Sequence, residues 1–272
     1  MNFCNAIALG IVQGLTEFLP VSSSGHLVIV QSFIPSFRQP GVLFDVMLHF
    51  GTLIAVVFFL FQDITALVSS FLPRTISCLS GEDRSRKRKT VYLIVIGTIV
   101  TGTIGLLSKD ILYDLFHSAR TAAFMLLVTG LFLYVADRVA GTNRTEGDMT
   151  AGDALIIGIA QAVALIPGIS RSGATISMGL LRHIKGETAA RFSFLLSIPA
   201  IVGATILELR HLTDLTENDF FVYCAGTATA AIIGFLTLKF LFYIIKRRQL
   251  RYFAYYCWAA GAITLAAKTF SW

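Results

Sequence analysis

Long apolar runs without a charged residue restrict what this chain can fold into. They cover residues 46–62, 90–108, 121–136, 192–207 and 220–238. A helix needs about 20 mostly apolar residues to cross the hydrocarbon core of a bilayer, whereas membrane β-strands alternate in polarity and these runs do not. Charged residues make up only 14% of the chain, against about 25% in a typical soluble domain. The sequence therefore predicts an all-α integral membrane protein.

The chain also carries an internal repeat. Residues 10–26 (GIVQGLTEFLPVSSSGH) match residues 158–175 (GIAQAVALIPGISRSGAT) at an offset of 148, and residues 96–107 match 225–236 at an offset of 129. An ordered series of matches along both halves is not expected by chance. We predict that residues 1–272 form a single membrane domain made of two homologous halves, 1–140 and 149–272.

The charges of equivalent loops indicate how the two halves are oriented. The loop 64–91 has six basic and two acidic residues, whereas its counterpart 208–219 has one basic and four acidic residues. The loop 109–120 is neutral, whereas its counterpart 246–251 has a net charge of +4. Lys and Arg gather on the cytoplasmic side of membrane proteins, so equivalent loops are expected on opposite sides. This pattern is typical of an inverted-topology repeat, in which binding sites lie near the midplane where the halves meet.

The spanning helices follow from this topology, with both termini facing outward and the two basic loops facing the cytoplasm. We place six of them at residues 44–62, 90–108, 121–138, 188–207, 220–245 and 252–270. The segments 3–34 and 152–183 remain, and each has short helical pieces around a Gly/Ser/Pro break. We predict that they are two re-entrant helix–loop–helix hairpins. Because irregular backbone at this depth needs protein or a water-filled cavity around it, the two loops should meet at a central cavity.

The second hairpin has the residues of an anion site. Ser170 and Ser172 are good N-caps for the helix that follows Pro167-Gly168. Gly173 permits a close approach of the backbone, and the helix start offers free N–H groups at the positive end of its dipole. Arg171 adds a fork-shaped donor, and Thr175 adds a hydroxyl. Phosphate is the expected occupant of such a site.

The first hairpin keeps the Ser/Gly loop, with Ser22, Ser24 and Gly25 at the equivalent positions, and adds an acid and a titratable ring. These two residues, Glu17 and His26, replace Leu165 and Ala174.

Glu17 lies four residues after Gln13, so the carboxylate and the amide oxygen share a helical face and could hold a hard divalent cation. His26 could move a proton or attack phosphorus, and Ser23 is a second possible nucleophile. A phosphate clamp, a metal and a base together suggest phosphoryl transfer.

Structural interpretations of the same residues stay open. Glu17 and Arg171 could form a purely structural ion pair, although ionisable groups within membrane segments are usually functional. The hydroxyls of Ser22, Ser24 and Ser172 could serve only as helix caps.

Other polar residues have simpler interpretations. Gln161 is expected to be a hydrogen-bonding residue of its hairpin, and Asp45 and His49 could support the site from behind. The basic run 84–89 is a topology signal and a contact for anionic lipid heads. Nucleic-acid binding has no support beyond it.

The two motifs closely resemble those of the undecaprenyl-diphosphate phosphatase family, which was first linked to bacitracin resistance. Its first pattern, Glu/Gln-x-x-x-Glu followed by Pro-Val-Ser-Ser-x-Gly-His, is met within residues 13–26. Its second pattern, Pro-Gly-x-Ser-Arg-Ser-x-x-Thr, is met at residues 167–175. The resemblance extends over the whole chain, including residues 44–52 and 192–200.

The resemblance implies a hydrolase of the bacterial inner membrane that removes the terminal phosphate of undecaprenyl diphosphate and so recycles the lipid carrier of cell-wall synthesis. It also implies a dependence on Mg²⁺ or Ca²⁺, with Glu17 and Gln13 serving the metal. Arg171, with Ser170, Ser172 and Thr175, would hold the diphosphate. His26 and Ser23 would share the chemistry, and the attacking group stays open between these two and an activated water.

Since the first hairpin enters from the outer face, the cavity should open there.

The sequence leaves open whether the protein forms a homodimer.

Two other functions share some of these sequence features. Inverted repeats with broken helices are also a transporter architecture, so a polyprenyl-phosphate transporter or flippase is the main alternative, alone or in addition. Glu17 and His26 argue against it, because a pure anion binder does not need them. An unrelated lipid phosphatase superfamily also uses a Ser-Gly-His element, but it needs a basic first motif and a downstream Arg with a distant His. After Arg171 the nearest histidine is His183, and no fitting Asp lies beyond it.

Overall fold

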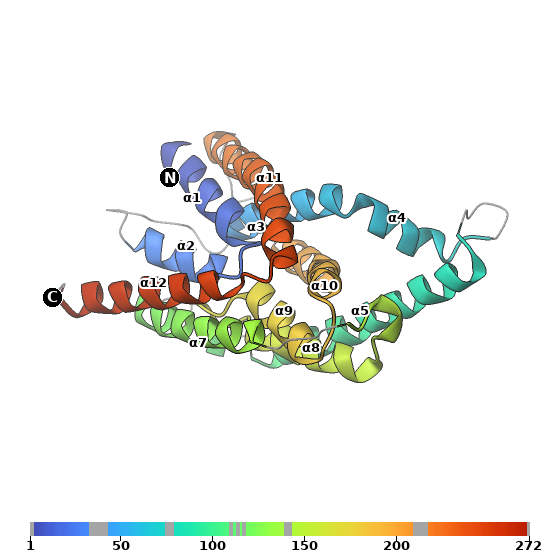
Figure 1. The fold of residues 1–272 in the computed structure, drawn as a ribbon. Coiled ribbons are helices and arrows are strands. Elements are labelled where there is room, and N and C mark those ends of the chain that lie inside the picture. Colours follow the sequence, from blue (N-terminus) through green and yellow to red (C-terminus); the bar gives the residue numbers. More distant parts are fainter. Residues whose placement is uncertain are drawn as a thin grey trace.

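The computed structural model describes residues 3–32, 43–73, 79–108, 118–138, 143–208 and 217–270, together with 111, 112 and 115. These residues form eleven α-helices and one short 3-10 turn, η1 (Glu146–Asp148). Figure 1 shows the helices: α1 (Phe3–Thr16), α2 (Ser23–Gln31), α3 (Leu43–Phe59), α4 (Phe61–Ser69), α5 (Gly81–Leu107), α7 (Ala119–Asp137), α8 (Ala151–Val163), α9 (Arg171–Leu181), α10 (Gly186–Glu208), α11 (Glu217–Lys246) and α12 (Arg251–Phe270).

The all-α integral membrane class is confirmed. Within the described residues, four helical stretches are long and apolar enough to cross a membrane: Gly81–Leu107, Ala119–Asp137, Gly186–Ile206 and Asp219–Lys246. The pair α3 and α4 makes a fifth if it is counted as one broken span, with a bend of 72°. The sixth predicted span coincides with α12, whose last side chains lie outside the described set. The count of six therefore stays a prediction.

Two predicted boundaries were wrong. The span expected at 44–62 ends at Phe59 and turns sharply into α4, and much of the loop expected at 64–91 is helical. The helix α5 begins at Gly81 because the Ser80 side chain accepts a hydrogen bond from the Asp83 N–H at 3.1 Å. Acidic residues in the first turn add favourable interactions with the helix dipole.

The basic run is used within the fold. Arg84 and Arg88 each donate to the Ser70 carbonyl at 2.8 Å, beside the C-terminal end of α4. Lys87 pairs with Glu146 at 2.8 Å. Cations at a helix C-terminus satisfy carbonyls that have no partner within the helix. The run thus fastens α4 and the 3-10 turn to the start of α5.

The two segments predicted as helix–loop–helix hairpins have that form, as α1–α2 and α8–α9. Each second helix begins at a serine N-cap, Ser22 for α2 and Ser170 for α9. The turn before α9 needs a glycine, because Gly168 has φ +95° and a Cβ there would lie 2.1 Å from the Ala122 carbonyl oxygen.

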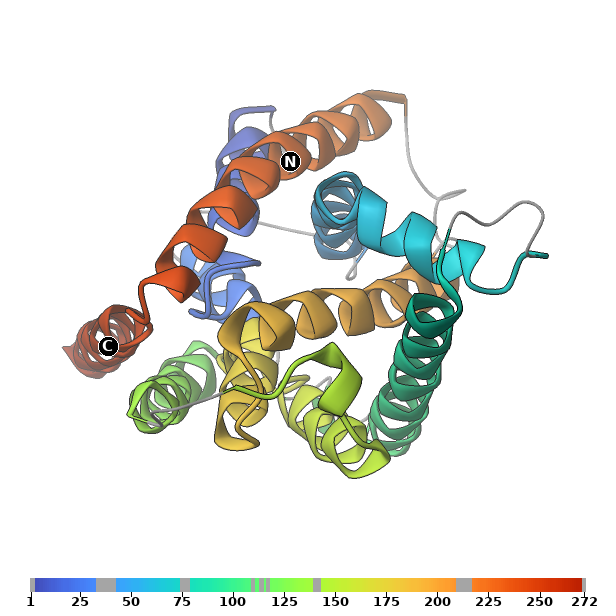
Figure 2. The same ribbon diagram turned by 45° about the vertical axis from the view of Figure 1, so that its right-hand side comes forward.

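Each hairpin packs against the other half of the chain. Helix α1 lies along α11, and α8 lies along α5, as both views show (Figures 1 and 2). Glycines at equivalent positions permit both crossings. A Cβ on Gly10 would lie 2.5 Å from the Gly226 carbonyl oxygen, and a Cβ on Gly158 would lie 2.8 Å from the Gly97 Cα. The two hairpin breaks are thereby brought together between the halves.

Candidate active site

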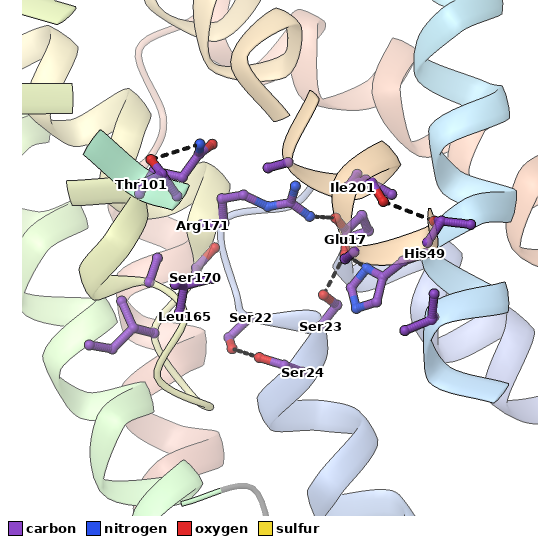
Figure 3. Close-up of a pocket in the computed structure, with 17 residues that line it drawn as sticks. Glu17, Ser22, Ser23, Ser24, His49, Thr101, Leu165, Ser170, Arg171 and Ile201 are labelled. Atoms are coloured by element: carbon purple, nitrogen blue, oxygen red, sulfur yellow. Dashed lines mark hydrogen bonds and ion pairs between the residues drawn. The ribbon is translucent and has the colours of Figure 1, made fainter. Parts of the chain in front are cut away.

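A cavity of about 250 Å³ lies where the two hairpin breaks meet. Helices α3, α5, α8 and α10 supply the rest of its wall. Its polar lining residues, most of them labelled in Figure 3, are Glu17, Ser22, Ser23, Ser24, His49, Thr101, Gln161, Ser170, Arg171 and Thr205. The apolar ones are Val46, Ala164, Leu165, Ile169, Ala200, Ile201 and Ala204. A lining that combines charged and polar side chains with apolar ones suits a ligand with a charged head and an apolar tail.

Glu17 is the centre of the polar network. It is only 8% exposed and forms an ion pair with Arg171 of the other hairpin (Figure 3). The Ser23 hydroxyl donates to Glu17 Oε2 at 2.5 Å, and Gln13 Nε2 donates to the same oxygen at 2.9 Å. His49 Nδ1 lies 3.1 Å from it. One carboxylate thus joins both hairpins and α3.

The local sequence explains where Glu17 and Ser23 point. Glu17 follows the last turn of α1, and its N–H donates to the Gln13 carbonyl at 2.9 Å, so Gln13 and Glu17 share a face. The chain then turns through Pro20 to Ser22, whose side chain caps α2 by accepting from the Gly25 N–H at 3.2 Å. Ser23 is the first residue of α2 and so faces back towards Glu17.

Two helix N-termini converge on the cavity. Helix α2 begins at Ser23 and α9 begins at Arg171, and both residues line the cavity. Helix N-termini carry partial positive charge and free N–H groups, so they attract anions. Together with the Arg171 guanidinium they give this end of the cavity the chemistry that attracts an anion.

Only part of the predicted second-hairpin set lies on the cavity wall. Ser170 and Arg171 line the cavity, whereas Ser172, Gly173 and Thr175 do not. These three stabilise the loop from behind. The Ser172 hydroxyl donates to the Leu19 carbonyl at 3.3 Å, the Gly173 N–H donates to Ser170 Oγ at 3.0 Å, and the Thr175 hydroxyl donates to the Arg171 carbonyl at 2.7 Å.

The positions of the two histidines are the reverse of those predicted, in which His26 lay in the site and His49 behind it. His26 is absent from the cavity wall: its Nδ1 lies 2.8 Å from the Ser22 carbonyl oxygen and its Nε2 lies 2.8 Å from the Tyr256 hydroxyl. His49, expected only to support the site, lines the cavity and contacts Glu17. Asp45 accepts from Gln31 at 2.9 Å and does not line the cavity.

The residues fit a divalent cation only if the substrate supplies further ligands. No group of three or more His, Cys, Asp or Glu side chains that could hold a metal occurs in the described part of the chain. Glu17 is the one carboxylate among the residues that line the cavity. The Gln13 amide oxygen is buried and has no hydrogen-bond partner. Gln13 does not line the cavity, and its Nε2 faces Glu17 Oε2, so the two side chains as placed do not present two oxygens to one ion. Glu17 would be the first ligand of a Mg²⁺ ion that keeps water and phosphate oxygens as its other ligands.

Thr101, which no motif indicated, forms a polar pair with Gln161 on the opposite wall. Gln161 Nε2 donates to Thr101 Oγ1 at 3.2 Å, and the Thr101 hydroxyl donates to the Gly97 carbonyl at 2.8 Å. Gln161 is therefore a hydrogen-bonding residue of the hairpin, as expected, but its amide oxygen is buried without a partner. A threonine within an apolar run was the available signal for Thr101.

Comparison with known families assigns the chain. The model of the family described as bacitracin resistance protein BacA matches residues 6–263. The chain belongs to the BacA family. The match includes both hairpins and the whole cavity, so the resemblance seen in the two motifs is confirmed over the length of the fold.

Relatives in the BacA family are similar from end to end. A protein of Syntrophotalea carbinolica named undecaprenyl-diphosphatase is 45% identical over 270 residues, which is 99% of this chain and 100% of the relative. Proteins of the same name from Halothermothrix orenii and Methanosphaera stadtmanae are each 41% identical, over 97% of this chain and 98% of the relative.

Proposed function

We propose that this chain hydrolyses undecaprenyl diphosphate to undecaprenyl phosphate and inorganic phosphate. Full-length relatives carry the name undecaprenyl-diphosphatase. The observation that carries the proposal is the contact of Glu17 with both Arg171 and Ser23 at the junction of two helix N-termini. In this proposal a base, a hydroxyl and a phosphate clamp share one cavity.

Arg171 binds the terminal phosphate in this proposal. Its guanidinium can donate two parallel hydrogen bonds to phosphate oxygens, and the N-termini of α2 and α9 add positive potential. In the absence of substrate Glu17 holds Arg171 in place through their ion pair. The incoming phosphate then either binds Arg171 alongside Glu17 or replaces Glu17 as the partner of Arg171.

Glu17 accepts the proton from the attacking group. The Ser23 hydroxyl already donates to Glu17 Oε2 at 2.5 Å. As an oxygen nucleophile bonds to the terminal phosphorus, its proton passes to Glu17 and the bridging P–O bond breaks. The electron pair of that bond leaves with undecaprenyl phosphate.

If Ser23 attacks, water then cleaves the phosphoserine. If water attacks, inorganic phosphate forms at once.

A divalent cation, Mg²⁺ or Ca²⁺, would be held by Glu17 and Gln13 together with phosphate oxygens. When bound, it would neutralise part of the charge of the diphosphate. For this role the Gln13 amide would turn so that its oxygen, and not Nε2, lies beside Glu17.

The membrane arrangement accommodates both ends of the substrate. The apolar cavity wall includes Ile201 together with Ala200 and Ala204 of α10, and the small side chains of the two alanines leave room for an isoprenyl tail that extends into the bilayer. We further propose six spans and two re-entrant hairpins in inverted repeats, 1–140 and 149–272, with the cavity open to the outer face of the inner membrane. Helix α1 of the first half packs on α11 of the second, and α8 of the second half packs on α5 of the first. This reciprocal packing supports the repeat.

Phosphate release from undecaprenyl diphosphate by the purified protein, with Mg²⁺ or Ca²⁺ supplied, tests the reaction. The wild type should release phosphate, and Arg171→Ala should release it far more slowly. Substrate binding without phosphate release by the wild type would overturn the proposal and favour the transporter alternative.

Sidedness has its own test. A cysteine introduced in place of Ser23 should react with a membrane-impermeant thiol reagent added from outside. Reaction only from the cytoplasmic side would contradict the outward opening.

A further inference from the structure

The loop that presents Ser23 contains a strained residue. Ser22 has φ +69° and ψ +94°, a conformation that L-residues other than glycine rarely adopt. Strain of this kind persists only where surrounding contacts hold it, and it gathers at functional sites. Ser170, the equivalent N-cap of the other hairpin, has an ordinary φ of −73°. Something in the first hairpin alone must therefore hold Ser22.

The contact found only in the first hairpin comes from His26. Both N-cap residues accept a hydrogen bond from the backbone N–H four residues later: His26 to Ser22 at 3.1 Å, and Ala174 to Ser170 at 2.8 Å. The His26 ring adds a second bond, since its Nδ1 lies 2.8 Å from the same Ser22 carbonyl oxygen. Ala174 has no side chain that could do this. The ring thus holds the carbonyl of the strained residue.

Tyr256 of α12 fixes that ring. A carbonyl oxygen can only accept, so His26 Nδ1 carries the proton that is donated to Ser22. In the neutral ring Nε2 is then an acceptor, and the Tyr256 hydroxyl, 2.8 Å away, donates to it. The two rings also stack, with an interplanar angle of 9°. Both ring nitrogens are occupied, and the ring does not line the cavity.

We propose that His26 and Tyr256 are positioning residues of the active site. Tyr256 holds the His26 ring, the ring holds the Ser22 backbone at positive φ, and this backbone places the Ser23 hydroxyl 2.5 Å from Glu17. The inference rests on the proposed function, because Ser23 and Glu17 matter only if the reaction takes place. It gives His26 a different task from the proton transfer or nucleophilic attack that the family resemblance implies.

Two amide substitutions separate the tasks of His26. The side-chain nitrogen of Asn takes the position of Nδ1, and that of Gln takes the position of Nε2. His26→Asn should keep the bond to Ser22 and retain kcat within about 5-fold of wild type, the effect of one lost neutral hydrogen bond. His26→Gln and His26→Ala should lose kcat by about 100-fold through misplacement of Ser23, with KM unchanged. If His26→Asn is as inactive as His26→Ala, the proposal is overturned.

Tyr256→Phe keeps the ring and removes only the hydroxyl. It should lower kcat about 3- to 10-fold, as expected for one lost hydrogen bond, and leave KM unchanged. The matched control is Tyr255→Phe, since Tyr255 is 49% exposed against 47% for Tyr256 and its ring contacts Tyr134 and Trp258. The control should retain wild-type kcat. Equal kcat values for the two Phe variants would overturn the proposal.

A measurement without turnover separates this inference from the proposed function. In the ¹⁵N spectrum of histidine-labelled protein, one neutral ring should be protonated at Nδ1, and its signals should vanish in His26→Asn. Tyr256→Phe should shift its Nε2 signal, and Tyr255→Phe should not. If the wild type releases no phosphate but shows these signals, the proposed reaction is wrong, whereas the hydrogen-bonded chain from Tyr256 through His26 to Ser22 stands. An Nε2-protonated His26 ring would refute the coupling whether or not phosphate is released.

Discussion

The two hairpins share one scaffold and carry different chemistry. Ser22 and Ser170 cap equivalent helices by accepting from the Gly25 and Gly173 N–H groups at 3.2 and 3.0 Å. The next position along each helix holds Ser23 in one hairpin and Arg171 in the other. Both of these side chains contact Glu17, which has no acidic counterpart because its equivalent is Leu165. A scaffold suited to two anion loops thus holds a hydroxyl and a cation on opposite sides of one carboxylate.

The conserved scaffold shows which differences matter. Gln13 and Gln161 both donate through Nε2, to Glu17 at 2.9 Å and to Thr101 at 3.2 Å, and both leave a buried amide oxygen without a partner. Gln161 Nε2 finds a neutral acceptor in the Thr101 hydroxyl of α5, so the second hairpin needs no charge at this point. The Glu17 carboxylate is therefore an addition to a scaffold that folds without it. Removing this charge should lower activity strongly and stability only a little.

Glu17→Leu gives the first hairpin the residue of its twin and should have the largest effect. We expect kcat/KM to fall by about 10³- to 10⁴-fold, because the proton acceptor is lost. The measurement is phosphate release from undecaprenyl diphosphate. Since Arg171 would lose its buried partner, Glu17→Gln serves as a second variant that keeps a polar group of similar volume. Activity above a tenth of wild type in Glu17→Leu would contradict the assignment of Glu17 as the base.

Arg171→Ala removes the residue that the first hairpin lacks. We expect kcat/KM to fall by about 10²- to 10³-fold through lost charge stabilisation. Arg171→Lys should recover only part of this, because an ammonium group keeps the charge without the two parallel donors. The same phosphate-release assay reads both variants. Arg171→Ala activity near wild type would show that the phosphate lies elsewhere in the cavity.

The sequence predicted the features that depend on local contacts. The hairpin breaks near Pro20 and Pro167, the apolar runs, and the N-caps Ser22 and Ser170 all involve neighbours along the chain. Ser24 and Ser172, also considered as caps, lie one residue inside the starts of α2 and α9, so that part of the prediction was wrong. The Glu17–Arg171 pair was within reach too, because the repeat aligned the two loops. The structure of the basic run 84–89 was harder to predict. This charged segment was expected to be a loop, but the cap at Ser80 makes it the start of α5.

The orientation of the two histidines could not be predicted from local sequence. His26 turns away from the cavity because its ring forms a hydrogen bond with Tyr256. This partner lies 230 residues further along the chain, so a local motif does not reveal it. His49 faces Glu17 because α3 packs on α10 and α11, which sets the rotation of that helix. Such choices depend on tertiary packing, and a motif cannot show them.

The glycine crossings offer a test of the scaffold alone. Gly10→Ala and Gly158→Ala should each lower the free energy of unfolding by about 1–3 kcal/mol, because a Cβ would force α1 from α11 or α8 from α5. The control is Gly102→Ala in α5, where a Cβ meets no atom within 4 Å, and we expect no loss there. Thermal unfolding in detergent measures all three. If only one of the two crossings is sensitive, the halves are not equivalent in packing.

Ser24→Ala and Ser172→Ala compare the last equivalent pair and should have the smallest effects. Ser24 lines the cavity, and its hydroxyl contacts Ser22 Oγ at 3.4 Å, a long contact that contributes little. Ser172 lies behind the wall, where its hydroxyl donates to the Leu19 carbonyl of the other hairpin at 3.3 Å. We expect Ser24→Ala to change kcat and KM by less than about 3-fold, and Ser172→Ala to cost about 0.5–1.5 kcal/mol in unfolding free energy with little change in KM. Steady-state kinetics and thermal unfolding of both variants decide it. A large rise in KM for Ser24→Ala would mean that the first hairpin binds the diphosphate through this hydroxyl as well, so that phosphate binding is shared between the hairpins and is not concentrated at Arg171.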